Sequence, residues 1–174
     1  AINESLIKFL REENKPLIIL SQEYLFPIYK QANEYKNLLN EYIPRHPGDT
    51  KLLEIHEMAW ALIQPRFMAE RALEIKEFNQ LHGTGKTSTD IQAIVRYARQ
   101  GRVHTLFLAD GKDILGYYDR ANDEVILKDM PWTRKNSLFN DAAIHTFLAD
   151  GNVYKLKQNE MPDNMFPVNA IIRS

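Results

Sequence analysis

Residues 83–87, Gly-Thr-Gly-Lys-Thr, are the stretch of this sequence whose residue types come nearest to a phosphate-binding loop. Such a loop wraps backbone N–H groups around a phosphate, and it needs a glycine five positions before the Gly-Lys pair, directly after a strand. Here that position holds Gln80, and a long helical pattern leads into the run. The spacing favours a simpler role, in which the two glycines end one helix before the next begins. The spacing therefore argues against a nucleotide-binding protein, which we rank below the two functional hypotheses given at the end of this section.

The histidines and aspartates do not show the spacing of a metal or catalytic site. No two histidines are four residues apart, the separation that places two imidazoles on one helical face. His104 and His145 both precede threonine amid apolar neighbours, so we interpret them as core or boundary histidines satisfied by a hydrogen bond. Four aspartates flank predicted strands, where short polar side chains favour turns over calcium binding. We predict no catalytic residue, metal ligand or cofactor from these two sets: His46, His56, His82, His104 and His145, and Asp110, Asp113, Asp119 and Asp123.

Trp132, Arg134 and Lys135 combine an aromatic ring with two cations in the short segment Pro-Trp-Thr-Arg-Lys. Side chains of these types are frequent in protein interfaces, and an aromatic ring can also stack on unpaired RNA bases. We take the three residues as a candidate partner-binding group, with packing inside the loop as the more ordinary alternative.

The fold class follows from a unit of helix, glycine and strand that occurs twice, at residues 89–109 and 136–157. The glycine after each helix, Gly101 or Gly151, is expected to take the left-handed conformation that ends a helix. Strand 103–109 is apolar on both faces, which is typical of the centre of a sheet covered on both sides by helices. The pattern predicts a compact α/β domain. One face of this strand should hold Val103, Thr105, Phe107 and Ala109, and the other Leu106 and Leu108.

Further elements complete this domain. Thr89 and Gln92 have capping-box spacing at the start of the first helix. Residues 114–119 and 124–129 flank a polar turn and predict an antiparallel hairpin towards one edge of the sheet. With the strands near 153–157 and 168–173, we expect about five strands in a mixed sheet, packed as a two-layer or three-layer sandwich.

The N-terminal half predicts an αβα segment followed by a long helix. We expect a short helix over 3–13, a doubly buried strand over 17–20, and a helical segment interrupted by Pro27. Two prolines and a glycine then make 42–49 a loop. The helix that follows runs from about residue 50 to residue 81, and Pro65 should kink it because its ring removes a backbone donor.

Composition excludes several classes of protein. The 174 residues are 44% apolar, enough for a buried core, and the net charge of −1 argues against a basic nucleic-acid-binding surface. The sequence has no cysteine and no run of about 20 apolar residues, so disulfides, thiolate metal sites and membrane spans are not expected. We expect a cytoplasmic protein, with further residues upstream of Ala1 in its parent.

Four segments together resemble the C-terminal part of the bacterial relatives of the archaeo-eukaryotic class 1 peptide-chain release factors and Pelota. These segments are residues 17–30, 84–111, 138–162 and 168–173. The resemblance implies that residues 1–48 are the end of a middle domain of ribonuclease-H-like fold and that residues 49–82 are a connecting helix. Residues 83–174 then form a third domain, an α/β sandwich related to kink-turn-binding ribosomal proteins.

The same resemblance implies a binding module rather than an enzyme. Such a module docks a translational GTPase such as elongation factor Tu, the ribosome, or both, in termination, rescue of stalled ribosomes or hibernation. The Gly-Gly-Gln tripeptide with which release factors hydrolyse peptidyl-tRNA does not occur in these 174 residues. The alternative is a domain that binds structured RNA, as the relation to kink-turn-binding proteins suggests.

Overall fold

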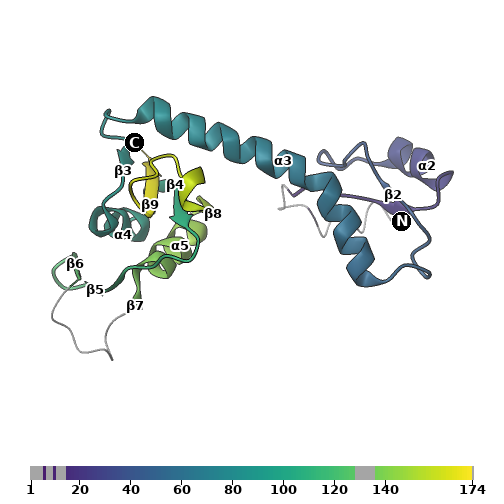
Figure 1. Cartoon of the computed structure of the whole chain (residues 1–174). Coiled ribbons are helices and arrows are strands. Elements are labelled where there is room, and N and C mark those ends of the chain that lie inside the picture. The colour runs from purple at the N-terminus through teal and green to yellow at the C-terminus, as the bar shows by residue number, and fades with distance from the viewer. Residues whose placement is uncertain (1–5, 7–9, 11–14, 128–135, 174) are drawn as a thin grey trace. The chain divides into compact units, whose positions relative to one another are not determined.

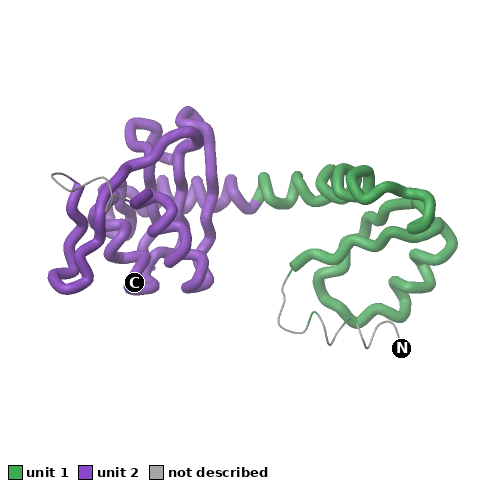
Figure 2. The backbone as a smooth tube through the Cα atoms, turned by 90° about the horizontal axis from the view of Figure 1, so that it is seen from below, with its two compact units in different colours: residues 1–69 green, residues 70–174 purple. Residues whose placement is uncertain are grey.

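The computed structural model describes residues 6, 10, 15–127 and 136–173, and the chain divides into two compact units. Unit 1 is residues 1–69 and unit 2 is residues 70–174 (Figure 2). The boundary falls inside helix α3 (Leu52–Leu81). Most of the helix expected over 3–13 lies outside the described residues. Among the described residues, no helix has the length and apolarity that a membrane span needs.

Unit 1 contains a minimal parallel sheet. Strand β1 (Leu20–Ser21) pairs with β2 (Ile43–Pro44), and an isolated bridge joins Leu17 to Leu38. The prediction of a doubly buried strand over 17–20 is wrong, because these residues are only half-buried and the strand proper has two residues. The loop predicted over 42–49 supplies the partner strand, and Pro44 limits its length because proline has no N–H for a ladder.

Two prolines of unit 1, Pro27 and Pro65, lie inside helices. Pro27 is the third residue of α2 (Leu25–Ala32). N–H groups in the first turn of a helix have no intrahelical acceptor, so a proline there costs no hydrogen bond. The prediction that Pro27 interrupts the helix is therefore wrong. On the same helix the buried Phe26 ring stacks on Tyr42 at 4.3 Å between centroids. The predicted long helix is confirmed as α3, which contains Pro65. A kink at Pro65 stays a prediction.

Unit 2 is built on a four-stranded mixed sheet with the strand order β3-β9-β4-β8 (Figure 1). Its strands are β3 (Thr87–Ser88), β4 (Val103–Ala109), β8 (Asn152–Leu156) and β9 (Val168–Ile172). Strand β4 is central, as predicted, because it pairs antiparallel with β9 and parallel with β8. A short 3-10 helix, η2 (Gln158–Glu160), follows β8.

Helices cover both faces of this sheet, which makes unit 2 a three-layer α/β sandwich. Helices α4 (Ile91–Arg99) and α5 (Leu138–Leu148) pack on one face, against Leu106 and Leu108 of β4. The last turns of α3 pack on the other face, where Phe78 meets Phe107 edge-on at 6.2 Å between centroids. The alternation along β4 follows the prediction for residues 105–109.

A β-bulge in β4 changes the orientation of its first residues. Val103 pairs with Ile172, and Thr105 pairs with Ile171, so His104 is an extra residue on β4. Val103 therefore joins the core with α4 and α5, contrary to the prediction that it shares a face with Phe107. The bulge also turns His104 towards α3, on the same side as Thr105.

The predicted hairpin forms, but in a separate sheet. Strands β5 (Leu115–Asp119), β6 (Glu124–Ile126) and β7 (Asn136–Ser137) make a three-stranded sheet in the order β6-β5-β7. The expectation of an edge position in the main sheet is wrong, because β5 has partners on both sides and none in the main sheet. The Gln92 side chain ties this sheet to α4 by donating to the Val125 carbonyl at 2.7 Å.

The C-terminal ends of α4 and α5, each followed by a strand, differ from one another. After α4, Gly101 has a φ of 70° and ends the helix as predicted. After α5, the left-handed residue is Asp150, with a φ of 56°, and the prediction for Gly151 is wrong. The cap of α4 also differs from the predicted Thr89, because the Asp90 side chain accepts from the Gln92 N–H. An aspartate one residue later satisfies the same free donors.

Candidate functional site

The Gly-Thr-Gly-Lys-Thr segment connects α3 to β3. Gly83 and Gly85 have φ values of 78° and 81°, and the Thr84 hydroxyl donates to the Leu81 carbonyl at the end of α3. The Lys86 carbonyl accepts a hydrogen bond from the Ile172 N–H at 2.8 Å, so this backbone extends the sheet. A phosphate-binding loop follows a strand, whereas this segment follows a helix and leads into a strand. The segment therefore serves as a helix end.

The sequence-predicted partner-binding group, Trp132, Arg134 and Lys135, lies outside the described residues. Its role stays a prediction.

The four aspartates make separate contacts: Asp119 and Asp123 lie in a turn, as predicted, whereas Asp110 pairs with Lys155. Asp119 accepts from the Asn122 side chain and from the Ala121 N–H, which together lower the pKa of the Asp119 carboxyl. Asp113 accepts from the Ile114 N–H and the Ser137 hydroxyl. Within the described residues, none of the four belongs to a group that could hold a metal ion.

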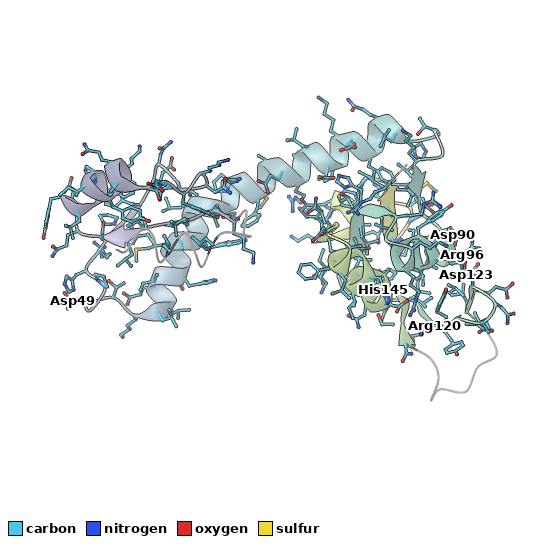
Figure 3. All side chains as sticks on the ribbon, turned by 180° about the vertical axis from the view of Figure 1, so that it is seen from behind. Asp49, Asp90, Arg96, Arg120, Asp123 and His145 are labelled. Carbon is cyan, nitrogen blue, oxygen red and sulfur yellow. The ribbon has the colours of Figure 1, made fainter. Side chains whose placement is uncertain are left out.

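His145 on α5 is held by its own helix, and Figure 3 labels it together with Asp123 at the β5–β6 turn. Its Nδ1 lies 2.9 Å from the Asp141 carbonyl oxygen, so Nδ1 carries the hydrogen of this bond. The interpretation of His145 as a histidine satisfied by a hydrogen bond is confirmed.

Arg99 joins α4 to α5 and to the smaller sheet. Its guanidinium donates twice to Asp141, from Nε at 2.9 Å and from Nη2 at 2.5 Å, and it lies 4.1 Å from the centre of the Tyr118 ring. The Tyr118 hydroxyl donates to Asp123 at 2.6 Å, and this bond together with burial raises the pKa of Tyr118. Every charged group of this cluster has a partner within it, which is typical of a structural ion pair.

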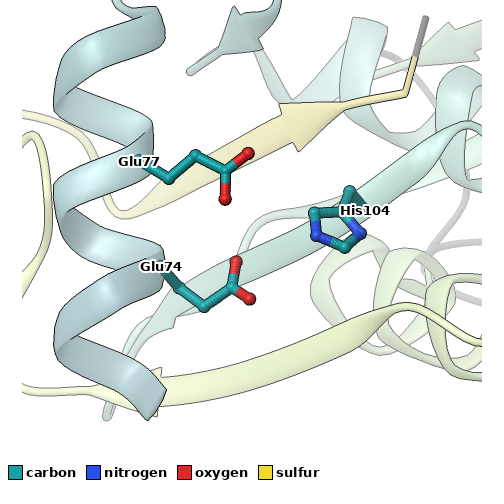
Figure 4. A group of neighbouring side chains, drawn as sticks. All are labelled: Glu74, Glu77 and His104. Atoms are coloured by element: carbon teal, nitrogen blue, oxygen red, sulfur yellow. The ribbon is translucent and has the colours of Figure 1, made fainter. Parts of the chain in front are cut away.

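Glu74, Glu77 and His104 bring their polar atoms together beside the bulge of β4 (Figure 4). One carboxylate oxygen from each glutamate and one imidazole nitrogen lie within 4.8 Å of one another. The two glutamates are three residues apart on α3, so both point to the same side of the helix. All three residues belong to unit 2.

Neighbouring side chains hold Glu74 in this group. The buried Thr105 hydroxyl donates to Glu74 Oε2 at 2.6 Å, and the Asn152 amide donates to Oε1 at 3.3 Å. The pKa of the nearby Tyr154 is raised, first by burial and then by the negative charges of Glu74 and Glu70. Sequence reasoning missed this group because the bulge that turns His104 towards α3 has no signature in the spacing. The pair of glutamates three residues apart was the available signal.

Helix α5 has a second apolar face that no described element covers. Leu138, Phe139 and Ala142 are buried under the helix. On its outer side, Ile144, Phe147 and Leu148 are 47%, 73% and 75% exposed. Positions 144, 147 and 148 are neighbours on a helix surface, so these side chains form one contiguous surface, here called the α5 apolar face. A helix that is apolar all round is normally buried, and contiguous exposed apolar surface marks interaction sites.

Comparison with solved structures defines the class of fold. An archaeal Pelota chain, from a model of ribosome-bound archaeal Pelota and ABCE1, is 12% identical and has a TM-score of 0.51, over 99% of this chain and 47% of that chain. The C-terminal domain of a peptide chain release factor from Methanosarcina mazei is 11% identical, with a TM-score of 0.48, over 72% of this chain and 97% of that domain. Pelota from Archaeoglobus fulgidus is 13% identical, with a TM-score of 0.40, over 98% of this chain and 52% of that chain. The first of these similarities shows that the chain has the mixed α/β fold of a Pelota-like domain. The chain spans about half the length of the two Pelota chains.

Sequence comparison identifies the family. The model of bacterial archaeo-eukaryotic release factor family 3 matches residues 1–102, more than half of the chain, and the chain belongs to this family. A search of curated proteins finds no significant match. The predicted family resemblance is confirmed.

Proposed function

We propose that this chain is a docking module of a translation factor, which binds a translational GTPase through the α5 apolar face and acts at the ribosome. Membership of the release factor family supports the connection with translation. The observation that carries the proposal is the contiguous exposure of Ile144, Phe147 and Leu148 on one helix. Protein interfaces concentrate binding energy in such aromatic and aliphatic anchors.

The charge of the chain favours a protein partner over a broad RNA contact. The net charge is −1, whereas binding to the phosphates of RNA relies on excess Lys and Arg. The cations of the sequence-predicted loop, Arg134 and Lys135, lie outside the described residues, so binding to structured RNA stays a prediction. We assign the chain no catalytic step, because its 174 residues do not contain the Gly-Gly-Gln tripeptide of hydrolytic release factors.

The proposed role also gives a domain organisation. We propose that residues 1–48 end a ribonuclease-H-like middle domain, that residues 49–82 connect it onward, and that residues 83–174 are the third domain that docks the GTPase. The continuous helix α3 and the sheet of unit 2 support this division, in which the last turns of α3 both connect the domains and cover one face of the sheet. The Pelota-like fold supports it further.

Co-sedimentation of the chain with bacterial ribosomes, with and without GTP-bound elongation factor Tu, tests the proposal. We expect GTPase-dependent association, and we expect Phe147→Glu to weaken it about 30-fold, which corresponds to about 2 kcal/mol for an interface anchor. Leu73→Glu is the matched control, because Leu73 is an exposed leucine on another helix of unit 2. No association in either condition would contradict the proposed function, and equal loss in both variants would contradict the role of the α5 apolar face.

A further inference from the structure

We infer that Glu74, Glu77 and His104 form a binding site for one divalent transition-metal ion such as Zn²⁺. The three side chains come from two elements, the last turns of α3 and the bulge of β4. Their potential ligand atoms already lie within 4.8 Å of one another, and the side chains converge on a common space (Figure 4). This inference is independent of the proposed docking function.

The chemistry of the donor set selects the class of metal. Two carboxylate oxygens and one imidazole nitrogen are ligands that Zn²⁺ accepts in its usual four-coordinate geometry. Mg²⁺ prefers oxygen ligands and retains its water, so an imidazole counts against it. Three protein ligands leave the fourth position of a tetrahedral ion to water.

One ligand is fixed and another is free to adjust. Glu74 is half-buried and both of its oxygens are oriented, by the Thr105 hydroxyl and the Asn152 amide. Hydrogen bonds of this kind around a ligand strengthen metal binding. Zn²⁺ bonds of about 2.0–2.2 Å place tetrahedral ligand atoms about 3.3 Å apart, so the group must contract slightly on binding. The exposed Glu77 side chain can supply this movement by rotation alone.

The local charge favours a cation. The carboxylates of Glu74 and Glu77 approach each other within the same group, and like charges at this separation repel. Among the residues that the structure describes, no Lys or Arg forms an ion pair with either of them. A divalent ion would relieve the repulsion and also occupy the imidazole nitrogen that the bulge directs here. The bulge is what distinguishes this group from an ordinary acidic helix face.

Titration of the chain with Zn²⁺ by isothermal calorimetry tests the inference. We expect one saturable site, at least tenfold weaker in Glu77→Gln and in His104→Gln, because even residues that merely orient metal ligands affect affinity 10- to 100-fold. The control is His46→Gln, which removes an exposed histidine beside Asp49 in unit 1 and should leave the affinity unchanged. Mg²⁺ at the same concentration should give no saturable binding.

A second readout keeps the test independent of folding defects. Co²⁺ should give the visible absorption of a low-coordinate site in the wild type and in His46→Gln, and should lose it in Glu77→Gln. Glu77 is exposed, so its variant should keep the circular dichroism spectrum of the wild type. Absence of saturable Zn²⁺ binding by the wild type would overturn the inference. Wild-type affinity in both Glu77→Gln and His104→Gln would do the same.

Discussion

Replacing Gly151 with alanine should destabilise unit 2, although Gly151 does not have the left-handed conformation for which glycine is usually selected. Gly151 lies directly after the left-handed residue, Asp150. Its importance comes from the space around it. A Cβ placed on residue 151 would lie 2.8 Å from the Val103 carbonyl oxygen, 2.9 Å from the Thr146 carbonyl oxygen and 2.6 Å from Thr146 Cγ2.

The magnitude follows from the nature of these neighbours. The two carbonyl oxygens are backbone atoms of β4 and α5, so the clash cannot be relieved by rotation of a flexible side chain. Forcing an extra carbon into a packed interior costs about 1–3 kcal/mol, and we expect Gly151→Ala to fall in this range. Asp150→Gly should be close to neutral, because relief of about 1 kcal/mol of left-handed strain is offset by the entropy of the added glycine.

Native-state hydrogen exchange measures this loss in unit 2 directly. The amides of Leu106 and Leu108, in the central strand, should report the free energy of unfolding of this unit. Gly151→Ala should accelerate their exchange by about 5-fold to 150-fold, the equivalent of about 1–3 kcal/mol. If Gly151→Ala changed the free energy of unfolding by less than about 0.5 kcal/mol, the close contacts around residue 151 would not limit its side chain. A large loss of stability in Asp150→Gly would show that Asp150 is not the strained residue at the end of α5.

Two further substitutions test the polar contacts of unit 2. Arg99→Lys should reduce its stability by about 1–3 kcal/mol, measured by chemical denaturation, because lysine cannot keep both hydrogen bonds to Asp141 while lying on the Tyr118 ring; a loss below 0.5 kcal/mol would contradict a structural role. Lys155→Ala should raise the pKa of Asp110 towards its ordinary value of 3.8, measured by carbon-13 NMR, because the Lys155 hydrogen bond and charge lower it. Since the folded-state pKa is the lower one, the stabilisation by this pair is complete above the ordinary pKa and is lost as the pH falls through the folded-state value. An unchanged Asp110 pKa in Lys155→Ala would contradict the pairing.

The elements that the sequence predicts well are those with a strong local pattern. The strand at residues 103–109 is apolar on both faces, and it lies at the centre of a sheet covered by helices on both sides. The capping position moved by one residue, to Asp90, because several neighbouring polar residues can satisfy the same backbone donors. Local pattern thus predicts the element but leaves its exact boundary open.

The features that the sequence did not predict depend on contacts between distant segments. The separate sheet of β5, β6 and β7 requires the pairing of Leu115 with Ser137, which no local periodicity specifies. The bulge at His104 requires the register of β4 against β9. The group of Glu74, Glu77 and His104 depends on that bulge, so a search for histidines at helical spacing could not find it. Groups of side chains that tertiary contacts bring together in this way become visible only in the folded structure.

The proposed function requires that a translational GTPase binds the α5 apolar face. NMR chemical-shift mapping of the isotope-labelled chain with GTP-bound elongation factor Tu measures this contact residue by residue. We predict that the affected resonances concentrate on α5, with the methyl groups of Ile144 and Leu148 and the ring of Phe147 changing most, and that the effect is lost in Phe147→Glu. An unchanged spectrum at saturating GTPase, or changes confined to other elements of unit 2, would contradict the claim.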